Sequence, residues 1–338
     1  MRKVLIALAV LAAPLAAEEP AKPATLAPSE IAAAAPKVDW AAIASSDLLV
    51  MDLAPDAKGK ARRVVIQLMP PPFSQGWIGN IRKLAAAHWW DGLSVNRVQD
   101  NYVVQWGDAA AEDKAKAKAL LAGLVMVPQN AYTIPIDGVM NADLATLLAA
   151  IGDQPGADPS PCMWSKSLGD YECLPVSGDE HLYAYLERFY KGWLYASDYE
   201  RAWPVHCYAM VGVGRDMPPS TGSGAELYTV IGHAPRHLDR NIALVGRVIE
   251  GIEHLSSLPR GTGALGFYET AEERVKIRAI RLGSEVNSLP TYEYLSTESA
   301  SFAHYANARA NRRDPFFIQP AGGADICNIP VPVRRAAK

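Results

Sequence analysis

Arg97 and Gln105 are the two side chains whose types and spacing best fit chemistry on a peptide. They stand in the stretch 94–108, SVNRVQDNYVVQWGD, where two short β-type runs flank the turn-forming Gln99-Asp100-Asn101. Asn and Asp favour such a turn because their side chains bond nearby backbone and tolerate left-handed geometry. A hairpin would bring the Arg97 guanidinium beside Gln105, and such a pair on an aromatic- and valine-lined face could hold a peptide by its amides. The alternative interpretation is a surface hairpin whose Arg97 is simply solvated.

The second run of this hairpin begins at Tyr102. Because side chains of a strand alternate between its faces, Tyr102 and Val104 are expected on one face, and Val103 and Gln105 on the other.

The same stretch resembles the FHR-to-QGGD segment of the cyclophilin-type peptidyl-prolyl isomerases. Asn96-Arg97 stands for the His-Arg pair and Gln105-Trp106-Gly107-Asp108 for QGGD, with no gap between them. The resemblance implies that Arg97 is the catalytic arginine and that Gln105 binds the substrate. It also implies that Tyr102 and Val103 line the pocket for the proline ring.

A second block resembles the same family. Residues 224–228, GAELY, stand where the family carries GSQFF, and residues 237–246 resemble its WLDGKHVVFG signature. The resemblance adds four residues to the expected substrate groove: Glu226, Tyr228, Leu238 and Ile242. Three of the matched positions differ from the family pattern, since Glu226 replaces a glutamine, His237 a tryptophan and Ile242 a rim histidine. The 210–224 loop is also about five residues longer than usual in the family, which indicates a remodelled groove.

The elements that must position these residues are mostly strands. Alternating or β-branched runs bounded by turn residues predict eight strands, which suits a small closed barrel filled by its own side chains. Helices are expected at 77–90, where apolar residues recur at helical spacing, and at 251–258. We therefore predict a mainly β protein with a closed eight-stranded antiparallel barrel capped by helices. The clearest strand ranges are 47–53, 62–68, 93–98, 102–106, 205–211, 226–231 and 275–282.

The chain divides into five expected parts. Residues 1–17 read as a signal peptide, 18–46 as an Ala/Pro-rich linker, and 47–282 as the cyclophilin-like domain. Residues 109–204 interrupt that domain as an inserted helical segment, and 283–338 form a C-terminal extension. In the insertion, composition and spacing predict helices at 110–124, 141–151 and 181–195. The extension is expected to hold a helix over 297–312 capped by Ser296, and a solvated basic end at Arg334-Arg335.

The N-terminus predicts export. Residues 1–17, MRKVLIALAVLAAPLAA, combine two cations, a short apolar run and small residues, the pattern of a secretory leader. An uncleaved anchor or a disordered tail is the alternative. No later stretch reaches the roughly 18 uninterrupted apolar residues of a membrane helix, so we expect no membrane span in the mature chain. The expected location is the periplasm.

Four cysteines suit an oxidising compartment. Four cysteines allow three pairings, and we favour Cys162–Cys173, which closes a short loop, with Cys207–Cys327 as the second disulfide. Zinc is the competing interpretation, but no CxxC occurs and the histidines are scattered. His233 and His237 are four apart, yet Pro235 between them argues against one helical face. We therefore expect no metal site.

Charge and other motifs exclude further classes. The net charge is −3, and removing Arg2 and Lys3 with the leader leaves 31 basic residues against 36 acidic ones. A nucleic-acid partner is therefore not expected. Residues 261–266 match GxGxxG but do not follow a strand, so the dinucleotide interpretation fails its context. Gly222-Ser223-Gly224 lacks the first glycine of a nucleophile elbow.

The reaction that the resemblance implies needs no cofactor. An X-Pro bond rotates slowly because of its partial double-bond character, with a barrier of ~18–20 kcal/mol. A permanently charged arginine can donate to the prolyl nitrogen more strongly as the bond twists. We therefore expect a prolyl isomerase that acts on proline-containing polypeptides during their folding after export. A non-catalytic peptide-binding or chaperone module on the same barrel is the alternative, and the oligomeric state stays open.

Overall fold

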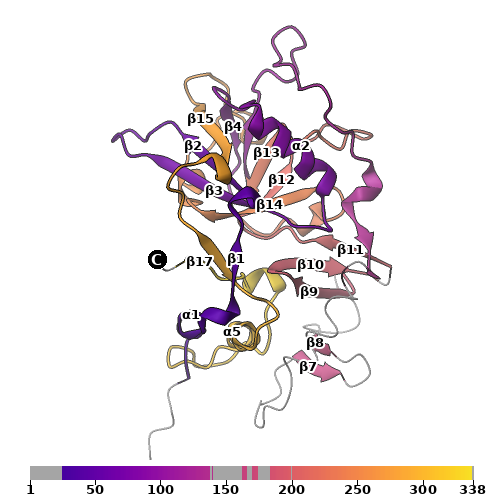
Figure 1. Ribbon diagram of the computed structural model, residues 1–338, viewed down its shortest axis with the longest axis vertical. Coiled ribbons are helices and arrows are strands. Elements are labelled where there is room, and N and C mark those ends of the chain that lie inside the picture. The colour runs from indigo at the N-terminus through magenta and orange to yellow at the C-terminus, as the bar shows by residue number, and fades with distance from the viewer. Residues whose placement is uncertain are drawn as a thin grey trace, which may run out of the picture.

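The computed structural model describes residues 25–137, 139, 183–198 and 200–336, and the backbone of 162–165 and 170–173. Its centre is a closed antiparallel barrel of eight strands in the order β12-β13-β5-β4-β15-β2-β3-β14 (Figure 1). This confirms the predicted fold class. The barrel strands are β2 (Leu48–Leu53), β3 (Arg62–Leu68), β4 (Ser94–Val98), β5 (Val103–Gly107), β12 (Met210–Val213), β13 (Leu227–Val230), β14 (Leu244–Glu250) and β15 (Val275–Leu282).

Alternation along the strands fills the barrel. In β2, Leu49 and Met51 join the main core, whereas Leu48 joins a smaller apolar cluster on the other face with Val65 and Tyr292. Side chains of successive strand residues point to opposite faces, so one face closes on the core and the other is free for a second layer. The strand sequences therefore specify both layers.

Helix α2 (Gln75–Ala86) closes one end of the barrel. Its Trp77, Ile81 and Leu84 are fully buried, and their spacing of three and four residues places them on one face. The helix ends four residues before the predicted Trp90, because His88 adopts a positive φ of 55°. Helix α4 (Glu253–Ser256) is a short counterpart within the predicted 251–258 range.

Three further sheets lie outside the barrel in the part of the chain that the structure describes. Figure 1 shows helices α1 and α5 side by side beyond one end of it, so the two terminal segments of the chain form one module. The first sheet is β6 (Ile134–Pro135), β11 (Arg201–Pro204), β10 (Trp193–Ser197) and β9 (Leu186–Tyr190); the second is β1 (Trp40–Ile43), β16 (Tyr292–Leu295) and β17 (Val333–Arg335); the third is β7 (Cys162–Ser165) and β8 (Asp170–Cys173). The module helices are α1 (Pro28–Ala34) and α5 (Ala300–Ala310).

The terminal module corrects three predictions. From Pro28 the expected linker carries α1 and β1, which pack against α5 and β16. The basic end is ordered and not simply solvated, since Arg334 and Arg335 lie in β17 and pair with Glu293 and Glu250, each at 2.6 Å, while the Arg335 side chain remains 61% exposed. The C-terminal helix begins at Ala300, three residues after the predicted start at Thr297, so Ser296 is not its cap. Its cap is Ser299, whose hydroxyl accepts from the backbone N–H of the third helical residue at 3.1 Å.

The predicted helix at 110–124 is wrong. This segment forms only isolated turns, such as those closed by the N–H groups of Asp113 and Lys116, and others of its groups bond to elements elsewhere in the fold. The Asp108 carboxylate accepts from the N–H of Lys118 at 2.6 Å, and the Trp89 indole donates to the carbonyl of Ala119 at 2.9 Å. Tertiary hydrogen bonds override the helix propensity of its alanines and lysines.

The predicted helix at 181–195 is also wrong. Here the chain forms the β9–β10 hairpin, whose turn places Lys191 and Gly192 at φ of 48° and 80°. Positive φ at both central residues gives the two-residue turn that matches the twist of paired strands. Apart from the 3-10 helix η3 (Gln129–Tyr132) and a helical stretch that begins at Asp137, the described part of the insertion is strands and loops. The predicted 141–151 helix falls outside the described residues. The predicted 205–211 strand is displaced, since β12 begins only at Met210.

The β9–β10 hairpin joins the barrel to the terminal module. Arg247 of β14 is buried, donates to the Gly192 carbonyl at 2.7 Å and lies 4.5 Å from the Trp193 ring centroid. Burial lowers its pKa to about 10. From the other side, Glu298 and Thr297 accept hydrogen bonds from the backbone of the same turn, at 2.8 and 3.0 Å. Among the described residues, no helix has the length and apolar character needed to cross a membrane.

Candidate active site

Four residues on neighbouring strands form a row across the outer face of the barrel. Arg97 of β4 is the cross-strand partner of Gln105 on β5, and Gln105 is the partner of Tyr228 on β13. Tyr228 in turn lies opposite Gly212 on β12. Since neighbouring strands are about 4.8 Å apart, this register brings the predicted arginine, glutamine and aromatic residue together.

A β-bulge turns Arg97 to this face. The pairing of β4 with β5 shifts between Val95 and Arg97, which leaves Asn96 as the extra residue. Val95 and Val98 both belong to the main core, an arrangement that strict alternation would forbid. Asn96 is held by its own contacts, accepting from Ser94 Oγ at 2.6 Å and donating to the Gly107 carbonyl at 3.1 Å. A bulge of this kind re-aims a side chain, and here that side chain is Arg97.

The guanidinium of Arg97 is surrounded by neutral groups. It donates to the Leu265 carbonyl at 2.7 Å, to Gln105 Oε1 at 3.3 Å and to Gln99 Oε1. The rings of Tyr102 and Phe267 lie 5.6 and 5.2 Å from its central carbon. Burial lowers the pKa of Arg97, and no carboxylate of the described residues forms an ion pair with it. Its charge is therefore uncompensated within the described protein.

The loop that covers Arg97 is the glycine-rich stretch 261–266. Gly261 donates its N–H to the Val98 carbonyl at 3.0 Å. Gly266 has a φ of 80°, and a Cβ there would lie 2.7 Å from the Cα of Gln99. The glycines thus allow the loop to lie directly on the end of β4. The GxGxxG pattern of residues 261–266 therefore has a structural role here and not that of a nucleotide site.

An apolar cluster adjoins this row. Val103, Tyr228 and Val230 are buried together, with Tyr102 and Ile242 packed against them. The face predicted for Tyr102 was wrong. This residue lies in the turn before β5, where strand alternation does not apply, and its ring contacts the same cluster as Val103. His237 stacks on Tyr102 with ring centroids 6.4 Å apart. Leu238 lies half-buried in the short helix η4 (Arg236–Leu238) and is not among the side chains packed on the cluster.

Glu226 lies beside Gln105. The Gln105 amide donates to its carboxyl at 3.4 Å. Burial raises the pKa of Glu226 to about 7. A Cβ at Gly107 would lie 2.2 Å from this carboxyl, so the glycine leaves the space that the acid occupies. The site thus contains an acid that titrates near neutrality next to the glutamine expected to hold the peptide.

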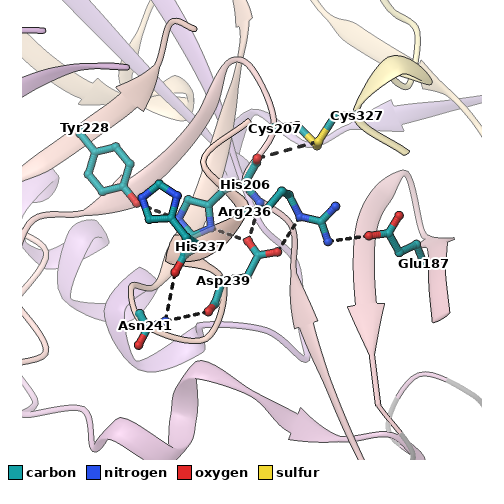
Figure 2. Close-up of polar contacts among 9 residues, drawn as sticks. All are labelled: Glu187, His206, Cys207, Tyr228, Arg236, His237, Asp239, Asn241 and Cys327. Atoms are coloured by element: carbon teal, nitrogen blue, oxygen red, sulfur yellow. Dashed lines mark hydrogen bonds and ion pairs between the residues drawn. A yellow bond between two sulfur atoms is a disulfide. The ribbon is translucent and has the colours of Figure 1, made fainter. Parts of the chain in front are cut away.

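A buried polar chain behind Tyr228 was not foreseen from the sequence. Figure 2 shows the Tyr228 hydroxyl against His206 Nε2, and His206 Nδ1 against Asp239, each contact 2.8 Å long. Arg236 then donates to Asp239 at 2.7 Å and forms an ion pair with Glu187 at 2.5 Å. The available signal was the polar composition of 236–241 within a strand-flanking segment, but nothing in it points to His206, about thirty residues earlier.

The Cys207–Cys327 disulfide forms as predicted, with a Cα–Cα distance of 5.2 Å. It ties the C-terminal extension to the residue that follows His206. Cys162 and Cys173 face each other in the β7–β8 register. Their side chains lie outside the described residues, so this second disulfide stays a prediction. In the ranges that the structure describes, no three His, Cys, Asp or Glu side chains are grouped as metal ligands.

Comparisons with known proteins identify the family and the fold. Residues 76–282 match the family described as "Cyclophilin type peptidyl-prolyl cis-trans isomerase/CLD". The fold is similar to the crystal structure of cyclophilin AquaCyp293 from Hirschia baltica, with a TM-score of 0.58 and 17% identity over 88% of this chain and 95% of that one. A cyclophilin-type isomerase of Cryptosporidium parvum, crystallised with the dipeptide Ala-Pro, is more distant, with a TM-score of 0.35 and 8% identity over 69% of this chain and 98% of that one. No curated protein matches the sequence at a significant level.

Proposed function

The chain belongs to the cyclophilin-type peptidyl-prolyl cis-trans isomerases (EC 5.2.1.8), and we propose that Arg97 is the residue that stabilises the twisted X-Pro bond. The observation that carries this role is the uncompensated charge of Arg97 in line with Gln105 and the apolar cluster. The electrostatic interaction of that charge with a substrate is not cancelled by a neighbouring carboxylate.

Each part of the site has a role in this proposal. The cluster around Val103 and Tyr228, with Tyr102 and Ile242, receives the proline ring by apolar contact. Gln105 fixes a peptide carbonyl or amide, and Glu226 contacts the residues that flank the proline. Leu238 contributes at the edge of the groove from η4.

Rotation then proceeds without bond breaking. As the X-Pro bond twists, conjugation is lost and the prolyl nitrogen gains a lone pair. An Arg97 N–H placed beside that nitrogen forms its hydrogen bond mainly in the twisted state, so it lowers the barrier more than it strengthens ground-state binding. No cofactor, proton transfer or nucleophile takes part in this step.

A proline-isomer assay tests the role of Arg97. We expect Arg97→Ala to lower kcat by about 10²–10³-fold, the effect of removing one preorganised donor aimed at developing charge. Arg97→Lys should restore little, because an ammonium lacks the planar fork that places a donor at a fixed angle. This role would be refuted if the wild type accelerates isomerisation and Arg97→Ala has the same kcat. Peptide binding without acceleration by the wild type would favour a non-catalytic binding module.

We further propose that the substrates are exported polypeptides that fold in the periplasm. Support comes from the leader-like pattern of residues 1–17 and from the Cys207–Cys327 disulfide, which persists in oxidising compartments. N-terminal sequencing of the protein from a fractionated cell should place the mature end near residue 18, in the periplasmic fraction. Recovery of the intact chain from the cytoplasm would contradict the proposal.

A further inference from the structure

Each hydrogen bond of the buried polar chain behind Tyr228 has a defined donor and acceptor. Asp239 Oδ1 accepts from both the backbone N–H and Nδ1–H of His206, at 3.0 and 2.8 Å. Burial lowers the pKa of His206, so its ring is neutral and carries its one proton on Nδ1. Nε2 therefore has a lone pair and accepts from the Tyr228 hydroxyl, whose pKa burial raises well above its usual value.

The order of groups is that of a nucleophile, base and orienting acid, but its position excludes nucleophilic chemistry. Tyr228 is 5% exposed and His206 is fully buried, so the hydroxyl points into the protein and away from the pocket. A hydroxyl with a raised pKa is also a poor nucleophile. What the chain can do is fix the ring of Tyr228, whose face closes the apolar cluster.

The Tyr228 ring needs this hydrogen bond to hold its position, because no side chain of the neighbouring strand packs against it at Gly212. Gly212, the cross-strand neighbour of Tyr228, has no side chain, and a Cβ there would lie 2.3 Å from the ring carbon that carries the hydroxyl. The tyrosine ring thus extends over bare backbone on that side. Its hydrogen bond to His206 determines how far it leans over this strand.

The far end of the chain belongs to the insertion. Arg236 is 4% exposed and holds Asp239 with one edge, while Glu187 of strand β9 pairs with another of its nitrogens. Burial opposes the charge of Arg236, but Asp239 and Glu187 outweigh it and raise its pKa. Glu187 is the end of the chain that reaches solvent, with a side chain 26% exposed. Figure 2 shows its carboxylate against the Arg236 guanidinium.

We infer that His206, Asp239 and Arg236 are positioning residues for Tyr228, and that Glu187 of the inserted hairpin sets substrate affinity through them. The inference rests on the proposed function, because it assumes that Tyr228 lines the proline pocket. A five-residue chain of short polar contacts transmits the position of β9 to that pocket, and residues within one such network couple energetically.

A double-mutant cycle tests the coupling. Glu187→Gln keeps the size of the side chain but removes its charge, and we expect it to raise KM roughly three- to tenfold with a smaller change in kcat. Tyr228→Phe keeps the ring and cuts the chain at its hydroxyl. In the Tyr228→Phe background, Glu187→Gln should leave KM unchanged. The matched control is Glu250→Gln, which breaks a 2.6 Å pair with Arg335 away from the pocket and should not alter KM.

Two results would overturn the inference. One is an unchanged KM in Glu187→Gln, and the other is an equal effect of Glu187→Gln in the wild-type and Tyr228→Phe backgrounds. A purely structural role would lower the yield or the unfolding midpoint of Glu187→Gln but leave KM per folded molecule as it was.

A spectroscopic readout separates this inference from the proposed function. In ¹⁵N NMR of the full chain, the ring of His206 should show a protonated Nδ1 and an unprotonated, hydrogen-bonded Nε2, and Tyr228→Phe should shift the Nε2 resonance. If the wild type does not accelerate isomerisation, the proposed function fails, and the same cycle is then read as the Kd of a proline-containing peptide. A proton on Nε2 of His206 would overturn the chain whatever the activity.

Discussion

Arg97 and Arg236 lie on opposite sides of Tyr228, one at the pocket row and one at the buried chain, and they differ in how their charge is balanced. Arg236 faces two carboxylates, which raise its pKa against the effect of burial. Arg97 donates to neutral oxygens only, and burial lowers its pKa. The charge of Arg236 is therefore used inside the protein, whereas that of Arg97 remains for a substrate. Retaining a half-buried charge without a carboxylate costs stability, as expected for a site that acts on a ligand.

The largest expected loss of stability follows from removing Arg236, the arginine of the buried chain. Arg236→Met leaves Asp239 buried with its His206 contacts but without a cation, and breaking a buried ion pair costs about 3–5 kcal/mol of unfolding free energy. The matched control is Arg281→Met, whose partner Asp91 lies 2.7 Å away with both side chains partly exposed. That pair is bidentate but partly exposed, so it should contribute about 1 kcal/mol, the upper end of the range for surface pairs. Urea denaturation measures both, and equal losses would show that Arg236 is not specially placed.

The disulfide belongs to the same buried side. Cys207 follows His206, and its bond to Cys327 encloses a sequence separation of 120 residues. Replacing both cysteines by serine should cost about 2–4 kcal/mol, because the unfolded chain regains loop entropy. The comparison is between the wild type and the double variant, both under oxidising conditions, so that any other disulfide stays intact. An unchanged denaturation midpoint would contradict this contribution.

The pocket side should respond in the opposite way. Arg97→Ala removes hydrogen bonds to neutral acceptors and the contacts of a half-buried side chain. We therefore expect the free energy of unfolding to change by about 1 kcal/mol or less. This small change would accompany the large loss of turnover expected for the same variant. A loss of stability as large as that of Arg236→Met would mean that Arg97 serves the fold and not a substrate.

The predictable parts of the molecule are those that depend on local pattern. Alternation identified most of the barrel strands, and the Arg97-to-Gln105 spacing identified two members of the row. The bulge at Asn96 was not predictable, because strict alternation places Arg97 on the inner face and only pairing with β5 reverses it. Tyr102 was assigned to the wrong face for the related reason that it lies just before the strand begins.

The insertion shows where local pattern is insufficient. Residues 181–195 have a helical aromatic stripe, but the Lys191-Gly192 turn and the contacts of Trp193 with Arg247 favour a hairpin. The Lys-Gly pair between two aromatic runs was an available turn signal. Residues 110–124 gave none, because their conformation depends on Trp89 and Asp108 from other elements. The link from His206 to Asp239 likewise requires the folded chain.

The smallest expected effect concerns Glu226, the acid beside Gln105. Glu226 has a folded pKa of about 7, raised by burial above its model-compound value of 4.5. The stability that this group contributes is fully present below pH 4.5 and is lost as the pH rises through 7, since the folded state holds the proton more tightly. Glu226→Gln should remove this decline, and a denaturation midpoint measured from pH 5 to 8 would show it.

The same titration should change peptide preference. Below pH 7 the Glu226 carboxyl is neutral, whereas above pH 7 a carboxylate stands beside Gln105. A lysine adjacent to the substrate proline would then gain up to about 1 kcal/mol, roughly a fivefold rise in kcat/KM relative to an alanine peptide between pH 6 and 8. In Glu226→Gln this ratio should not change with pH. If the ratio rises equally in that variant, the preference comes from another acid, and the pocket side is less free of anions than its geometry indicates.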